Sequence, residues 1–139
     1  MGAIMAFFIK LSWPQDEFSK YGDNAKSMHL MQRASEGGEL SNEDWSYLKS
    51  RIKSQDINNI DAALSAAMET HDPVQKAELS DIAYNLALFD VSEPSGLVRG
   101  KALVTLYRLH DARVGQLMTE FKNDQRELVK FAILIIKSR

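Results

Sequence analysis

Six amphipathic segments follow one another between residues 39 and 139, and they constrain this chain more than any other feature. Within each segment, apolar residues recur every three or four positions, which is the period of a helix with one buried face. Short links separate the segments and carry helix-starting residues, for example Asp72-Pro73 and Ser41 with Asp44. Such side chains can accept the free backbone N–H groups of a helix start. The pattern predicts an all-α domain, because amphipathic helices bury their apolar faces against one another.

Several expectations concern the interior of this domain. The segment that begins at Pro73 carries apolar residues outside its main stripe, so we expect it to be the most enclosed helix. Gly100 and Gly115 lie within helical segments, where glycine costs about 1 kcal/mol relative to alanine. We expect both glycines to allow the close approach of two helices. Asp124 and Glu127 have the spacing of a capping box for the last helix.

The first 38 residues differ from the rest of the chain. Gly37-Gly38 is the clearest break, so we place a boundary there, between an N-terminal arm with short helices (1–38) and a helical repeat domain (39–139). From residue 7 onward, larger apolar side chains occupy every second position, at Phe7, Ile9, Leu11 and Trp13, which fits an extended arm over residues 4–13; a short helix is the alternative. Exchange of this arm between two copies would give a homodimer. No apolar stretch is long enough to span a membrane, so we expect no membrane partner.

Charge is divided unevenly along the chain. Residues 1–98 contain 8 Lys and Arg against 15 Asp and Glu, whereas residues 99–139 contain 9 against 4. The basic C-terminal part can form a surface for an anionic partner, either an acidic protein or a nucleic acid. Alternatively, its bases pair with the acidic half of the same molecule and with acids of neighbouring turns. These acids are Asp111, Glu120, Asp124 and Glu127.

Residues that would support catalysis or metal binding lack the required spacing. The chain contains no cysteine, so it can form neither a disulfide nor a thiolate metal site, and a reducing compartment such as the cytoplasm is expected. His29, His71 and His110 do not have metal-ligand spacing. Gly96 and Gly100 lack the Lys and Ser or Thr of a phosphate-binding loop. We therefore expect a protein without enzymatic activity, metal or cofactor.

Two turns in the C-terminal half repeat one pattern at an offset of 31 residues. Glu93 is followed five and six positions later by Val98 and Arg99, and Asp124 is followed in the same way by an apolar residue and a base. The residues of the second copy are Val129 and Lys130. The acid can accept backbone N–H groups at the helix start and reach a base on that helix or its neighbour, while the valine faces the core.

These turns resemble those of HEAT and armadillo repeats, in which antiparallel helix pairs stack into a solenoid. Asp124 is similar to the turn aspartate of a HEAT unit, and Val129-Lys130 is similar to its Val-Arg step. The resemblance implies an all-α fold of antiparallel helix pairs stacked as a short HEAT-like right-handed solenoid. The pairs would cover residues 42–70, 73–109 and 111–138. A plain helical bundle is the rival architecture.

Tyrosines and exposed bases are the best candidates for a binding surface, because tyrosine brings contact area at low entropic cost and bases attract anionic groups. The candidate partner-binding residues are Tyr47, Tyr84, Arg99, Tyr107, Arg108, Arg113, Arg126 and Lys130. We expect a non-catalytic helical-repeat module that recognises a partner protein by charge complementarity, as an adaptor or as a bacterial immunity or inhibitor-type protein does. The alternative is a nucleic-acid-associated helical protein that acts through the basic C-terminal helices.

Overall fold

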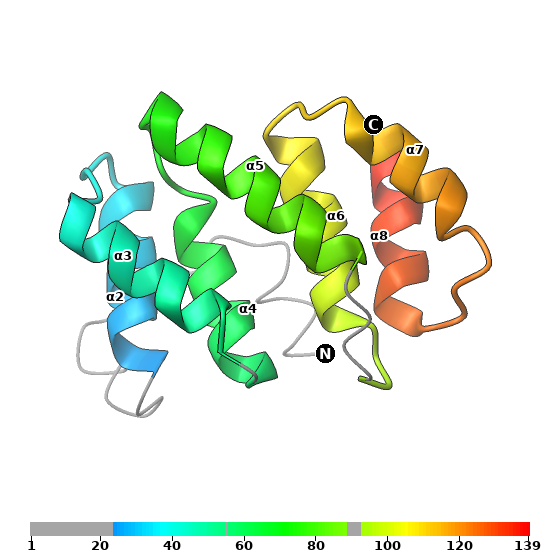
Figure 1. Cartoon of the computed structure of the whole chain (residues 1–139), viewed down its shortest axis with the longest axis horizontal. Coiled ribbons are helices and arrows are strands. Elements are labelled where there is room, and N and C mark those ends of the chain that lie inside the picture. The colour runs from blue at the N-terminus through cyan, green and yellow to red at the C-terminus, as the bar shows by residue number, and fades with distance from the viewer. Residues whose placement is uncertain (1–23, 55, 89–92) are drawn as a thin grey trace. The chain divides into compact units, whose positions relative to one another are not determined.

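The computed structural model of the chain describes residues 24–54, 56–88 and 93–139 (Figure 1). In these ranges every regular element is a helix, as the amphipathic pattern predicts. The helices are α2 (Ala25–Ser35), α3 (Asn42–Ile52), α4 (Ile57–Ala67), α5 (Pro73–Leu88), α6 (Leu97–Arg108), α7 (Arg113–Glu120) and α8 (Glu127–Lys137). The last six correspond to the six amphipathic segments. The arm predicted at residues 4–13 lies outside the described residues.

The structure confirms one of the two predicted capping boxes and contradicts the other. Ser41 and Asp44 form the expected capping box at the start of α3. The box predicted for Asp124 and Glu127 is wrong, because the N-cap residue of α8 is Arg126. Asp124 instead accepts the N–H of Arg126 at 3.0 Å, which orders the turn before the helix.

Two helices end at a residue with left-handed backbone. After α2 this residue is Gly37 (φ 97°), and after α6 it is His110 (φ 58°). In both turns the next N–H bonds to the carbonyl five positions earlier, as Asp111 does to Leu106 at 3.0 Å. The left-handed conformation suits glycine but strains a residue with a Cβ atom, so His110 is held there by the surrounding turn.

The chain divides into two compact units, residues 1–76 and 77–139. In the first unit, α2 and α3 both pack on α4 (Figure 1). The face of α4 includes Ala63, Ala66 and Ala67, all fully buried, and such small side chains let neighbouring helices come close. The boundary predicted at Gly37-Gly38 falls inside this unit, in the link between α2 and α3.

Helix α6 is the central helix of the second unit. It packs extensively on α8 and less extensively on α7. The prediction that α5 is the most enclosed helix is wrong: α6 is buried along nearly its whole length, Lys101 and Thr105 included, whereas α5 leaves Leu88 41% exposed. The core of the unit combines residues from four helices. They are Ala83, Ala87, Ala102, Leu103, Leu106, Leu117, Val129 and Ile136.

Gly100 brings α6 and α8 together. A Cβ atom at this position would lie 2.6 Å from the carbonyl oxygen of Leu128, so the close approach predicted here is confirmed. The same prediction for Gly115 is wrong, because nothing lies within 4 Å of its Cβ position. Helix α8 contacts α6 more extensively than it contacts α7, its expected partner in the pair 111–138. None of the helices in the described ranges has the length and apolar character needed to cross a membrane.

Candidate functional site

The repeated turns before α6 and α8 have part of the geometry that their sequence predicts: both acids accept backbone N–H groups, but among the described residues only Asp124 also forms ion pairs with bases. Glu93 accepts the N–H groups of Ser95 and Leu97, each at 2.8 Å. Partial burial acts to raise the pKa of Glu93, but the hydrogen bonds from Ser95 and Leu97 outweigh it, so the pKa lies below its ordinary value. Val98 and Val129 are both buried. The acid therefore fixes each helix start while the valine enters the core.

Asp124 joins two arginines at the second of these turns. Its Oδ2 atom lies 2.9 Å from Arg99 Nη1 and 2.7 Å from Arg126 Nη2. Hydrogen bonds from Arg126, and to a lesser degree from Arg99, hold the pKa of Asp124 far below its ordinary value despite the opposing effect of burial. Arg99 also donates from Nε to the Ala87 carbonyl at 2.8 Å and stacks 3.9 Å from the centre of the Phe121 ring. The candidate bases Arg99 and Arg126 therefore stabilise the turn, and their side chains are only 13% and 21% exposed.

In the turn before α8, Asp124 contacts the arginine two positions later, an arrangement that we call Asp-x-Arg. The turn before α7 contains a second Asp-x-Arg arrangement. Asp111 accepts the N–H of Arg113 at 2.9 Å, and its Oδ2 lies 2.7 Å from Arg113 Nη2. The hydrogen bonds from Arg113 lower the pKa of Asp111. Sequence reasoning missed this motif, although a comparison of residues 111–113 with 124–126 finds it.

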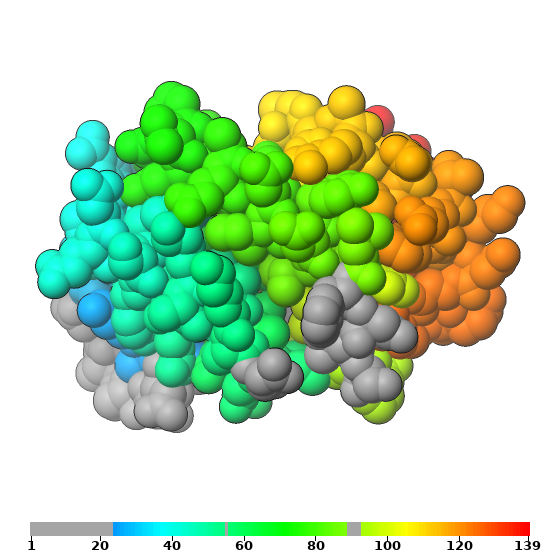
Figure 2. All heavy atoms as spheres, in the orientation of Figure 1, coloured from blue at the N-terminus to red at the C-terminus, as the bar shows by residue number. Residues whose placement is uncertain are grey.

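Arg113 differs from the other two arginines because it lies at the surface, with 38% of its side chain exposed. Its guanidinium stacks on the ring of Tyr84, 4.4 Å from the ring centre, and its Nη2 lies 3.1 Å from Asp81 Oδ1. Asp81 itself is 75% exposed. We call these four residues, Tyr84, Asp81, Asp111 and Arg113, the Tyr84–Arg113 cluster. The cluster lies on α5 and at the start of α7, whose atoms are green and orange in Figure 2.

The remaining candidate residues do not join this cluster. Tyr47 belongs to the first unit, where Lys26 lies 4.3 Å from the centre of its ring. Tyr107 is half-buried against the core of the second unit. Arg108 and Lys130 are exposed, on α6 and α8 respectively.

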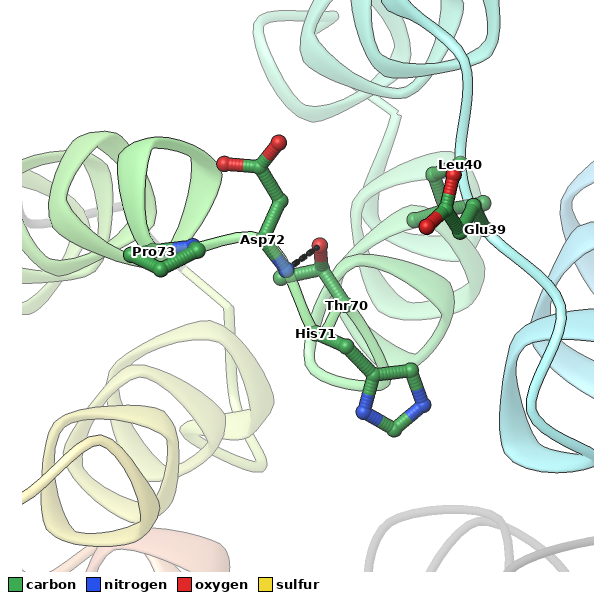
Figure 3. Close-up of a pocket in the computed structure, with 6 residues that line it drawn as sticks. All are labelled: Glu39, Leu40, Thr70, His71, Asp72 and Pro73. Atoms are coloured by element: carbon green, nitrogen blue, oxygen red, sulfur yellow. Dashed lines mark hydrogen bonds between the residues drawn. The ribbon is translucent and has the colours of Figure 1, made fainter.

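A pocket of about 230 Å³ lies in the first unit, between the α2–α3 link and the start of α5 (Figure 3). Its lining includes Glu39, Thr70, His71 and Asp72. Figure 3 shows Thr70 directed to the backbone of Asp72, whose N–H donates to the Thr70 hydroxyl at 3.2 Å. The Nε2 atom of His71 forms a hydrogen bond with the carbonyl oxygen of Ala34, at 3.1 Å. These polar groups serve the local fold, and no group of three or more potential ligands for a metal ion occurs in the part of the chain that the structure describes.

Comparison with known proteins gives no relative for this arrangement. No model of a protein family, no curated protein sequence and no solved structure matches the chain.

Proposed function

We propose that this chain is a non-catalytic helical-repeat module that binds a partner protein through charge complementarity. Helix packing supports the repeat architecture: α2 packs on α4 in the first unit, and α6 packs on α8 in the second. Contact between helices two places apart in the chain is what stacked helix pairs produce. The turns at Glu93 and Asp124 support it further, because both fix the start of a helix whose valine enters the core.

The observation that carries the binding proposal is the Tyr84–Arg113 cluster. Tyrosine and arginine are the residue types that dominate binding energy in protein interfaces. Here Arg113 is fixed by Asp111 and by the Tyr84 ring before any partner arrives, so little side-chain entropy remains to be lost on binding. Asp81 adds an exposed carboxylate beside the exposed guanidinium. A partner can therefore be selected by charge as well as by contact area.

An adaptor or an inhibitor-type protein of the bacterial cytoplasm, such as an immunity protein, is one concrete form of this proposal; small size and the acidic composition of residues 1–98 support it. Binding of nucleic acid has less support. Arg99 and Arg126 both contact Asp124, and their side chains are only 13% and 21% exposed, so neither is well presented to a phosphate.

Affinity capture from cell extract tests the proposal. The full chain is used as bait at low and at physiological ionic strength, beside Arg113→Ala and the control Lys122→Ala, which removes an exposed base outside the cluster. We expect the wild type and Lys122→Ala to retain the same protein, and Arg113→Ala to lose it. Circular dichroism verifies that both variants are folded. Retention of nucleic acid instead of protein, or equal capture by all three baits, would contradict the proposal.

A further inference from the structure

The packing of α8 covers only part of its apolar surface. Six consecutive apolar residues occupy positions 131–136. Its inner face, Leu128, Val129, Ala132 and Ile136, is buried, and the extensive helix contact of α8 within the described residues is with α6. A helix that is apolar all round is normally covered all round.

The apolar residues of α8 outside its inner face form a defined surface. At 100° per residue, Phe131 and Leu134 lie on the side opposite Val129 and Ile136, and Ile135 lies between Phe131 and the buried Leu128. Leu134 is 67% exposed, whereas Phe131 and Ile135 are half-buried. We call Phe131, Leu134 and Ile135, together with Lys130 and Lys137 at their edge, the α8 outer face.

Charge gives this surface its specificity. Lys130 and Lys137 are both exposed. They lie four residues before and three residues after Leu134, which places both on one edge of the apolar strip. Unlike Arg99 and Arg126, neither lysine forms an ion pair with any residue that the structure describes. A partner that covers the strip therefore gains from carrying acids at the matching positions.

We infer that the α8 outer face binds an acidic amphipathic helix of the partner protein; this inference rests on the proposed function. The apolar stripe of such a helix would cover Phe131, Leu134 and Ile135, as in helix-in-groove recognition, and its acids would meet Lys130 and Lys137. A second copy of the chain fits less well, because pairing α8 with itself opposes lysine to lysine. An exposed leucine and a half-buried phenylalanine also suit an apolar stripe better than a row of phosphates.

Selection from a peptide library tests the inference. A displayed library of random peptides of about 20 residues, long enough for several helical turns, is selected against the full chain. We expect the selected peptides to be acidic, with apolar residues at three- and four-residue spacing. Their affinity should fall about tenfold in Leu134→Glu and in Leu134→Ala, the loss that one buried anchor side chain supplies. Lys130→Glu should weaken binding at low salt more than at high salt.

The matched control is Val74→Glu, which places the same charge at another exposed apolar residue, 76% exposed on α5. It should leave peptide affinity unchanged. Peptides that are not acidic, or that bind Leu134→Glu as tightly as the wild type, overturn the inference. So does a wild-type dimer that Leu134→Glu dissociates in sedimentation. If peptide binding depends on Arg113 and not on Leu134, the inference fails while the proposed function stands; if neither peptide nor extract protein binds, both fail.

Discussion

Gly100→Ala and Gly115→Ala make the same chemical change and should have opposite effects on stability. At Gly115 the new methyl group meets open space on the exposed side of α7, so the gain in helix propensity stabilises the fold by about 0.5–1 kcal/mol. At Gly100 the Cβ atom would lie 2.6 Å from the carbonyl oxygen and 3.0 Å from the carbonyl carbon of Leu128. Both are backbone atoms, so no rotamer change relieves the clash and α8 itself must move.

The size of the Gly100→Ala effect follows from two opposing contributions. Overpacking a core contact costs about 1–3 kcal/mol, and contact with a neighbouring backbone belongs at the upper end of that range. The higher helix propensity of alanine offsets about 1 kcal/mol of this cost, which leaves a net destabilisation of about 1–2 kcal/mol. Urea unfolding followed by far-UV circular dichroism measures both variants against the wild type. If Gly100→Ala is as stable as Gly115→Ala, then α6 and α8 do not meet at Gly100 and the packing of the second unit is wrong.

Three further substitutions test individual turns. Asp124→Asn should lower the free energy of unfolding by about 2 kcal/mol at neutral pH, because two arginines lose a charged acceptor. Since the folded pKa of Asp124 lies below its ordinary value of 3.8, this contribution is complete above that value and is lost as pH falls through the folded pKa; a pH series of urea unfolding that shows a constant difference would refute it. His110→Gly should stabilise the fold by about 0.5–1 kcal/mol by removing the strain of a left-handed residue, and His110→Ala, which keeps the Cβ atom, should give no such gain in thermal unfolding. Ser41→Ala should cost about 1 kcal/mol through loss of the α3 capping box, and an unchanged urea midpoint would contradict that role.

Short-range sequence patterns predicted the helices and several of the turns. Ser41 with Asp44 is a short-range pattern, and the structure places it at the start of α3 as a capping box. The acids at Glu93 and Asp124 likewise act on backbone groups a few residues away. In such cases the sequence contains both partners within one turn, so spacing alone is informative.

Packing over longer distances could not be predicted in this way. Helix α5 carries many apolar residues, yet α6 is the enclosed helix, because burial depends on how many neighbours surround a helix and not on its own composition. Gly100 and Gly115 look alike in the sequence, but only Gly100 faces another backbone. Arg99 reaches Asp124 across 25 positions, which no local spacing indicates.

The candidate binding surface could likewise be predicted only in part from the sequence. Tyr84 and Arg113 were each identified by residue type, but the stacking that makes them one cluster joins α5 to α7. The second Asp-x-Arg turn, residues 111–113, was present in the sequence and needed only comparison with residues 124–126. Conversely, Arg99 and Arg126 resemble surface bases in the sequence, and the fold uses them inside a turn.

Photo-crosslinking in living cells tests the central claim, that the chain binds a partner protein beside the Tyr84–Arg113 cluster, most directly. A photoreactive amino acid replaces Asn85 on α5 or Gln116 on α7, both exposed, and Lys53 in the first unit serves as an exposed control. We predict one discrete protein adduct from positions 85 and 116, reduced when Arg113→Ala is combined with either and absent from position 53. No adduct at positions 85 and 116, or the same adducts from all three positions, would contradict the account.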